Sequence, residues 1–257
     1  MSLSSSRASG RAAATPSGGA ASDEIGARTL ARLAGAERLN AWIYGQLRPG
    51  VAGEVLEVGC GLGSMSRFIV ADARQVVLAD RAPEYLEALR LELGAAGERV
   101  TVIGWDLDEP PPAALAARRF DAIVAINVLE HVTDDGAAVR ALAALLRPGG
   151  RLLIYVPACP FAFGALDEGL EHRRRYDRRT LGAVLSAAGL SSPPAHYMNR
   201  LGLAGWLWVG RVSRRRAIPA ALIDVFERLV PLARVFDVLT GFVPAGLGLV
   251  ARATKPE

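Results

Sequence analysis

The sequence is poor in the residues that mark several protein classes. Only two of its 257 residues are cysteines, Cys60 and Cys159, and they lie too far apart to form a metal-binding pair. We therefore expect no metal site. Two distant cysteines also make no disulfide framework, which favours a reducing compartment, and we expect a cytoplasmic protein. No run of the sequence reaches the eighteen consecutive apolar residues typical of a membrane-spanning helix.

Lysine is almost missing as well. Of the 30 basic residues, all but Lys255 are arginine, and the formal net charge is +4. Together with the abundant alanine, this bias is typical of GC-rich bacterial coding sequences. The arginines are not interleaved with aromatic residues in the way that RNA-binding surfaces require. We therefore expect a bacterial protein without a nucleic-acid partner.

The first 22 residues consist mainly of serine, alanine, glycine and arginine, and contain no acid. They lack the apolar core of a secretory signal, and their composition also resembles an organelle transit peptide. We interpret residues 1–22 as a disordered bacterial tail. The hydrophobic content of 51% is sufficient for one α/β domain over residues 23–257.

Apolar strands and amphipathic helices alternate along most of this domain. This alternation predicts a Rossmann-like, doubly wound and mostly parallel sheet. Two helical patterns within 201–243 then predict a helical insertion before the last strand. The expected strands are 54–58, 76–80, 100–103, 120–126, 151–156 and 246–253, and the expected helices are 23–47, 64–71, 83–96, a stripe through 139–146, and 178–188.

A glycine-rich segment, Glu57-Val58-Gly59-Cys60-Gly61-Leu62-Gly63, follows the first expected strand. Glycines at alternate positions favour a tight turn that a ligand can approach closely. Further polar residues, Asp80, Asp106 and Asn127, stand at the ends of neighbouring strands. Ligands of open α/β sheets bind outside these carboxyl ends, and Asp80 is spaced to accept hydrogen bonds from both hydroxyls of a ribose.

Two cofactor classes compete for this turn. A dinucleotide site has the pattern G-x-G-x-x-G, whereas Ser64 stands here in place of the third glycine. The carboxylate of Glu57 disfavours a pyrophosphate and favours a cationic ligand such as a sulfonium with an ammonium group. A nicotinamide-dependent oxidoreductase remains the alternative.

Several motifs of the sequence together resemble the class I S-adenosylmethionine-dependent methyltransferases. The resemblance implies S-adenosylmethionine as the cofactor and an antiparallel last strand, and a non-catalytic domain that binds this cofactor is a further alternative. The motifs are Glu57 to Gly63, Val77 to Asp80, Gly104 to Leu107, Phe120 to Val124, Asn127 to Val132, and Leu146 to Leu152.

The resemblance also implies roles for individual residues at the cofactor. Glu57 and the Asn127 carbonyl would lie near the methionine ammonium group, and Asp80 would bind the ribose. Asp106 would accept from the adenine amino group, beside the Leu107 amide. The remaining residues expected at the cofactor are Gly59, Cys60, Gly61, Gly63 and Arg81.

The sequence offers three histidines as a base for an oxygen acceptor. His131 lies in Leu-Glu-His-Val, which resembles the same tetrad of quinone-biosynthesis O-methyltransferases. His172 lies in a segment similar to Gly-His-x-Arg-Arg-Tyr of a methyltransferase subgroup, with Glu171 in place of glycine. We predict that His131 or His172 is catalytic and that Arg175 and Tyr176 hold an anionic or phenolic acceptor. The alternatives are loop fixation and an ion-paired helix start, and His196 is expected to be structural.

The insertion 201–243 has three interpretations. Trp206, Trp208, Phe226 and Phe236 can form an apolar lid over a hydrophobic acceptor. An arginine cluster beside the tryptophans, Arg211 with 214–216, can instead rest on an anionic membrane, and ordinary packing of a capping subdomain is the third. The sequence thus predicts methyl transfer to a small or lipid-like acceptor, preferably at oxygen, with the oligomeric state left open.

Overall fold

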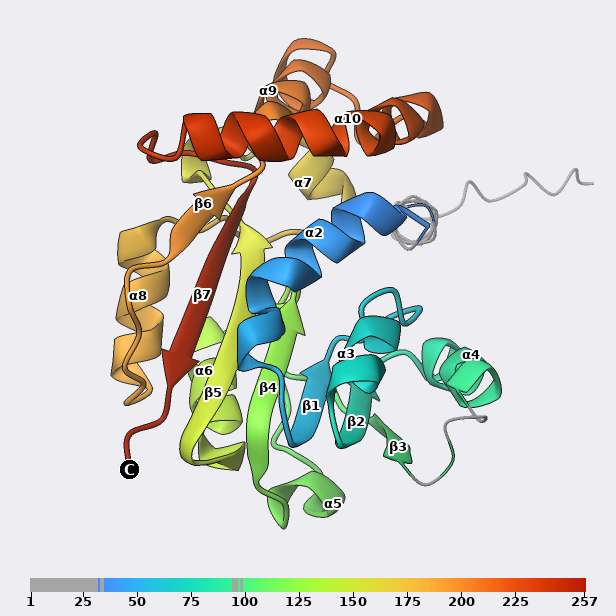
Figure 1. Ribbon diagram of the computed structural model, residues 1–257, viewed down its shortest axis with the longest axis vertical. Coiled ribbons are helices and arrows are strands. Elements are labelled where there is room, and N and C mark those ends of the chain that lie inside the picture. The colour runs from blue at the N-terminus through green and yellow to red at the C-terminus, as the bar shows by residue number, and fades with distance from the viewer. Residues whose placement is uncertain (1–31, 33–34, 94–96, 98) are drawn as a thin grey trace, which may run out of the picture.

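The protein folds around one seven-stranded sheet of strand order β3-β2-β1-β4-β5-β7-β6 (Figure 1). The computed structural model describes Arg32, residues 35–93, Gly97 and residues 99–257. Neighbouring strands from β3 to β5 pair in parallel, and β7 pairs antiparallel with both β5 and β6. The predicted fold is therefore confirmed. The strands are β1 Glu54–Val58, β2 Gln75–Asp80, β3 Val100–Gly104, β4 Phe120–Ile126, β5 Leu146–Pro157, β6 His196–Met198 and β7 Gly248–Thr254.

Helices cover both faces of the sheet. They are α2 Glu37–Leu47, α3 Ser66–Asp72, α4 Pro83–Leu93, α5 Ala113–Ala116, α6 Asp135–Leu145, α7 Ala165–Gly169, α8 Arg178–Ala187, α9 Arg200–Leu207 and α10 Ala220–Leu239. Short 3-10 turns lie at Arg48–Gly50 and Pro160–Ala162, and a π-helical turn at Trp208–Val212 follows α9.

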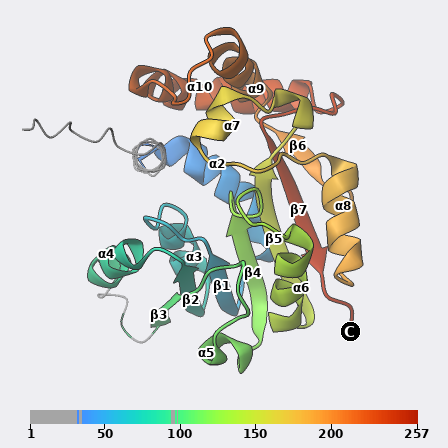
Figure 2. The ribbon, with the colours of Figure 1, turned by 180° about the vertical axis from the view of Figure 1, so that it is seen from behind.

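Adjacent residues of a strand supply the two halves of the core. In β1, Val55 packs with α2, α3 and α4, whereas Leu56 packs with α5, α6 and α8 on the opposite face. Figure 2 shows α6 and α8 on the rear face. Because both faces are covered, the central strands are apolar throughout, and all of β2 after Gln75 is buried.

Two local features differ from the sequence-based expectation. Strand β5 begins at Leu146, so Pro148-Gly149-Gly150 lies inside the strand at a register shift instead of separating it from a helix. The short strand β6 was not predicted, since three residues carry no recognisable alternation. The expected helix 23–47 is described as α2 from Glu37 onward, and the predicted tail 1–22 lies outside the described residues.

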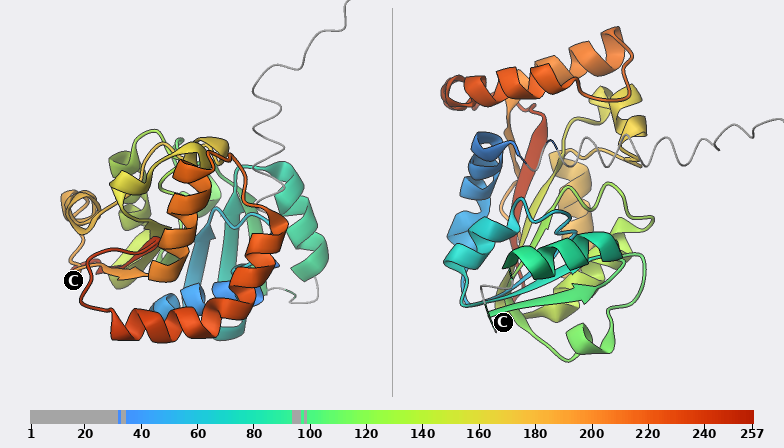
Figure 3. Two further views of the ribbon diagram at one scale, coloured as in Figure 1. Left: turned by 90° about the horizontal axis from the view of Figure 1, so that it is seen from above. Right: turned by 90° about the vertical axis from the view of Figure 1, so that its right-hand side faces the viewer.

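The predicted helical insertion is present between β6 and β7. Helices α9 and α10 lie at the end of the sheet where the parallel strands terminate, above α2 and beside α7 (Figures 1 and 3). Within the described residues, no helix is both long enough and apolar enough to cross a membrane. The insertion therefore faces the edge of the sheet at which the sequence placed a ligand site.

Candidate active site

The glycine turn after β1 is held by Asp80 at the end of β2. Asp80 Oδ2 accepts a hydrogen bond from the Gly61 N–H at 2.8 Å, and Oδ1 accepts one from the Ala82 N–H at 2.9 Å. Gly59, Gly61 and Gly63 have φ of +65°, +51° and +78°, which favours glycine at each position. Each Asp80 oxygen retains a lone pair, so the carboxylate can also accept from two ligand hydroxyls.

Glu57 lies beneath this turn at the end of β1. Its side chain is buried, its Oε2 accepts from Ser66 Oγ at 2.6 Å, and burial raises its pKa to about 8. With this pKa we expect Glu57 to be protonated at neutral pH when no ligand is bound. A bound cation would favour its ionised form, and a cationic ligand is what the resemblance implies here. Cys60 is also buried, and burial raises the pKa of its thiol, which makes it unreactive.

The other residues expected at the cofactor lie along the same edge. The Trp105 N–H donates to the Asp80 carbonyl at 2.9 Å, which places the segment of Asp106 and Leu107 beside the end of β2. Asn127 follows β4 with φ +52°, and Arg81 is exposed. The structure thus brings the predicted residues together, and their contacts with a cofactor remain predictions.

Replacing Asp80 by alanine is expected to weaken binding of S-adenosylhomocysteine by about 1–3 kcal/mol. The change removes the charged acceptor and leaves the Gly61 N–H without its partner. Isothermal titration calorimetry measures the effect. The control is Glu84→Ala, which removes an exposed acid of the α4 first turn. Equal affinities of the two variants would remove Asp80 from the cofactor site.

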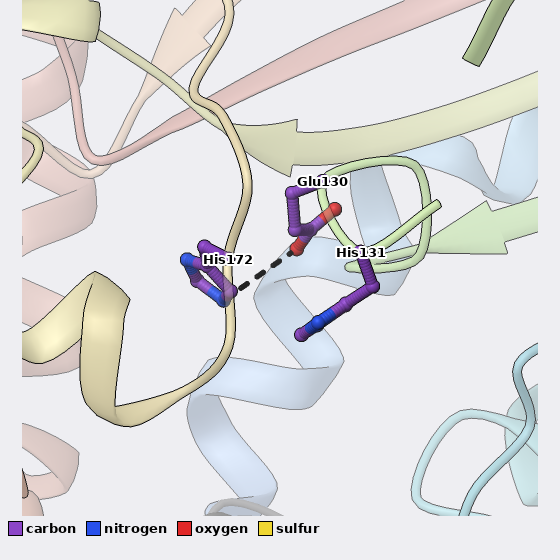
Figure 4. A group of neighbouring side chains, drawn as sticks. All are labelled: Glu130, His131 and His172. Atoms are coloured by element: carbon purple, nitrogen blue, oxygen red, sulfur yellow. Dashed lines mark ion pairs between the residues drawn. The ribbon is translucent and has the colours of Figure 1, made fainter. Parts of the chain in front are cut away.

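A second group of polar side chains joins two distant segments (Figure 4). Glu130 and His131 follow β4, and His172 lies between α7 and α8. The histidine rings meet edge to face with their centroids 4.9 Å apart. Arg173 ties the segments together, because its N–H donates to the Glu130 carbonyl and its Nε to the His131 carbonyl, each at 2.8 Å. The structure therefore brings together the two histidines predicted to be catalytic.

Glu130 is the member of this group that the sequence analysis missed. It is fully buried, and neither carboxylate oxygen has a hydrogen-bond partner among the described residues. Burial raises its pKa to about 8, and burial together with the adjacent His172 lowers the pKa of His131 to about 4. At neutral pH we expect a protonated Glu130 and an uncharged His131. One ligand atom from each of Glu130, His131 and His172 lies within 4.8 Å of the others, which is close enough for the three to share a metal ion. The expectation of no metal site stays a prediction.

His172 is oriented by the buried carboxylate of Asp167. Its Nδ1 lies 2.9 Å from Asp167 Oδ1, and its Nε2 lies 4.0 Å from Glu130 Oε1. Burial alone would raise the pKa of Asp167, but hydrogen bonds from His172 and Arg175 outweigh it and hold that pKa below its usual value. An ionised Asp167 favours the proton on Nδ1, which leaves Nε2 free as a base.

Arg175 and Tyr176, which the sequence analysis predicted to hold the acceptor, are both buried and bonded within the protein. Arg175 donates to Asp167 Oδ1 and to the Ala158 carbonyl, both at 2.7 Å, and its guanidinium lies 4.5 Å from the centroid of the Trp206 ring. The Tyr176 hydroxyl lies 2.8 Å from Asp135 Oδ2, and its ring is buried. Their burial was not predicted, and it disfavours direct contact with an acceptor. Binding of the acceptor by these two residues stays a prediction, and a positioning role is the alternative. His196 contacts Gln46 at 3.2 Å, in agreement with a structural role.

Glu171 adopts the backbone conformation that glycine prefers, with φ +59°. Glu171→Gly should therefore stabilise the protein by about 0.5–1 kcal/mol, because the left-handed conformation strains a residue with a Cβ. A thermal melt should show a midpoint higher by about 1–4 °C. The matched control is Glu168→Gly inside α7, which should destabilise the protein. An unchanged or lower midpoint for Glu171→Gly would contradict the strain assigned to this turn.

Comparisons with known proteins agree with this site. Residues 56–152 match the family model described as a methyltransferase domain. Over 135 residues the chain is 36% identical to the ubiquinone biosynthesis O-methyltransferase of Xanthomonas axonopodis pv. citri, covering 52% of this chain and 55% of that protein. The corresponding enzyme of Xanthomonas oryzae pv. oryzae is 35% identical over 134 residues, covering 51% and 55%. The chain thus aligns with only about half the length of these relatives.

Solved structures share the fold at low sequence identity. The N-methyltransferase NodS of Bradyrhizobium japonicum, in complex with S-adenosylhomocysteine, has a TM-score of 0.55 and 16% identity, covering 85% of this chain and 86% of NodS. The [4+2]-cyclase SpnF has a TM-score of 0.57 and 18% identity, covering 86% and 80%. The predictions of a methyltransferase and of S-adenosylmethionine as its cofactor agree with these findings. Residues 56–152 of the chain therefore match a methyltransferase domain, and the chain as a whole shares its fold with solved structures that include an N-methyltransferase.

Proposed function

We propose that this protein transfers the methyl group of S-adenosylmethionine to an oxygen atom of a small, lipid-like acceptor. The observation that carries the cofactor assignment is the Asp80 carboxylate, which holds the glycine turn and can still accept from two hydroxyls. The buried Glu57 at the same edge suits the cationic part of this cofactor. Oxygen as the acceptor atom is supported by the names of the Xanthomonas relatives.

The residues of the second group suit the removal of a proton from a hydroxyl acceptor. When bound, S-adenosylmethionine supplies an electrophilic methyl group on a sulfonium. We propose that His172 Nε2 takes the acceptor proton as the oxygen attacks in line, and that Asp167 stabilises the resulting imidazolium through Nδ1. The uncharged His131 beside it keeps the surroundings of His172 free of a further positive charge. An oxygen–methyl bond would form as the methyl–sulfonium bond breaks, S-adenosylhomocysteine would leave as the neutral thioether, and the acceptor proton would remain on His172.

Methyl transfer needs a direct test because one neighbour in fold is a cyclase. A cofactor-binding domain without turnover is the competing hypothesis, and the methyltransferase domain match disfavours a nicotinamide-dependent oxidoreductase. Cytoplasmic location, bacterial origin and the lack of a nucleic-acid partner stay proposals. The Xanthomonas relatives support the bacterial origin.

The proposal is tested with methyl-labelled S-adenosylmethionine and a series of phenols and catechols that differ only in the length of an alkyl tail. We expect label in a methyl ether and release of S-adenosylhomocysteine, with higher kcat/KM for the longer tails. Label on carbon or nitrogen would contradict the acceptor atom. Binding of S-adenosylhomocysteine without turnover of any acceptor in the series would favour a non-catalytic domain.

A further inference from the structure

Helix α10 carries an exposed apolar stripe along its whole length. Its six members recur at spacings of three and four residues, which places them on one face of the helix. Each of these side chains is between 38% and 70% exposed. We call this set the α10 stripe: Leu222, Val225, Leu229, Leu232, Phe236 and Leu239.

The α10 stripe points outward because the adjacent face of the helix is buried against the rest of the protein. Ile223, Val230 and Ala233 from that face are buried. Glu227 accepts from the Arg38 and Leu39 N–H groups at the start of α2, each at 2.9 Å. Asp237 accepts from two backbone N–H groups at the start of α9. These contacts fix the orientation of α10 about its own axis. The helix lies at one end of the molecule (Figure 3), and the exposed fractions of the α10 stripe show that its side chains are uncovered.

The same segment holds the positive charge of the molecule. Residues 200–243 contain seven arginines and three acids, an excess of four that equals the formal net charge of the whole chain, +4. Two of those acids, Glu227 and Asp237, are already bonded to backbone N–H groups. An exposed arginine cluster directly precedes α10 and consists of Arg211, Arg214, Arg215 and Arg216.

Exposed aromatic side chains flank the helix at both ends. Trp208 is 64% exposed in the π-helical turn that also holds Arg211, and Phe242 is 84% exposed just after α10. Apolar side chains on one face, arginines beside them and aromatic residues at the ends are typical of helices that lie in the plane of a membrane interface.

We propose that the α10 stripe and the arginine cluster form a docking surface for an anionic lipid bilayer, with α10 lying along the surface. The three-and-four spacing also suits pairing with a second copy of this chain. Such pairing would place the arginine cluster against a segment whose single acid not bonded to backbone N–H groups is Asp224. Arg216 of the cluster already pairs with Glu168 at 3.6 Å. For Arg211, Arg214 and Arg215, anionic headgroups supply a negative charge that a second copy offers only at Asp224, so the bilayer fits better.

Sedimentation of the full chain with lipid vesicles tests this proposal. We expect at least about tenfold stronger binding to phosphatidylcholine vesicles that contain phosphatidylglycerol than to phosphatidylcholine alone, with the difference reduced by salt. The variant Leu232→Gln/Phe236→Gln should bind both kinds of vesicle less. The variant Arg214→Gln/Arg215→Gln/Arg216→Gln should lose the preference for phosphatidylglycerol.

Two matched controls lie away from this surface. Leu91→Gln removes an 82% exposed leucine of α4, and Arg119→Gln removes an exposed arginine next to β4, so both should bind as the wild type does. Unaltered affinity for S-adenosylhomocysteine shows that a variant is folded and keeps this test separate from the proposed activity. Folded wild type that does not sediment with either vesicle would overturn the proposal. A wild-type dimer that does not bind vesicles, and that Leu232→Gln/Phe236→Gln converts to a monomer, would overturn the proposal in favour of pairing with a second copy.

Discussion

His172→Ala should lower the rate of methyl transfer by about 10²–10⁴-fold, the range expected for loss of a general base. Its Nε2 is the free nitrogen of an imidazole whose Nδ1 is bound to Asp167 at 2.9 Å. The fold should survive, because Asp167 keeps Arg175 and the Gly164 N–H as partners. Steady-state kinetics with a phenolic acceptor measure the loss, and calorimetry should give an unchanged affinity for S-adenosylhomocysteine.

The control for this variant is His196→Ala. His196 is also a partly buried histidine, but its partner is Gln46 on α2, outside the proposed site. We expect its turnover to remain within about threefold of the wild type, as for a substitution that touches no reacting group. Equal turnover of the two variants would reduce His172 to a structural residue. A similar loss in His131→Ala alone would transfer the base role to His131.

Arg175→Met should lower the free energy of unfolding by about 3–5 kcal/mol. Arg175 and Asp167 form an ion pair at 2.7 Å in which both side chains are 0% exposed. Removing the guanidinium leaves the buried carboxylate with weaker partners, His172 Nδ1, the Gly164 N–H and the Trp206 indole. Urea denaturation with two spectroscopic probes measures the change, and part of the loss should be recovered by adding Asp167→Leu.

Arg174→Met is the matched control for that loss. Arg174 pairs with Asp135 at 3.0 Å and donates to the Val132 and Thr133 carbonyls, each at 2.9 Å. Its side chain is 28% exposed, so water can replace these partners, and we expect a loss of about 1–2 kcal/mol, smaller than that of Arg175→Met. If Arg175 instead held the acceptor, as its sequence context predicted, Arg175→Met would raise KM and leave stability unchanged. That outcome would support Arg175 as a residue that holds the acceptor and would contradict its positioning role.

The sequence predicted the cofactor half of the site far better than the acceptor half. The strand that ends before Asn127 was predicted at its observed bounds, Phe120–Ile126, because a buried parallel strand is a continuous apolar run. Gly61 and Asp80 come from consecutive strand ends, and parallel pairing places such ends side by side. The local apolar pattern and the general topology of parallel sheets were therefore sufficient to predict the cofactor half of the site.

The acceptor half depends on contacts that no local pattern contains. Glu130 meets His172 only because the segment after α7 folds back over the turn after β4. Arg175 is buried because Trp206 of the insertion covers it, about thirty residues along the chain. A signal was nevertheless present at Glu171, since the motif that this segment resembles has glycine there. Glycine favours a left-handed conformation, which Glu171 adopts at φ +59°.

The most direct test of the central claim is a calorimetric titration of the wild-type protein with three ligands: S-adenosylmethionine, S-adenosylhomocysteine and NAD. The Asp80 carboxylate, which we propose accepts from two ribose hydroxyls, suits a sulfur nucleoside as well as NAD. The buried Glu57 beside the glycine turn disfavours a pyrophosphate, so the account predicts binding of both sulfur nucleosides and no binding of NAD. Binding of NAD with no binding of either sulfur nucleoside would contradict the account.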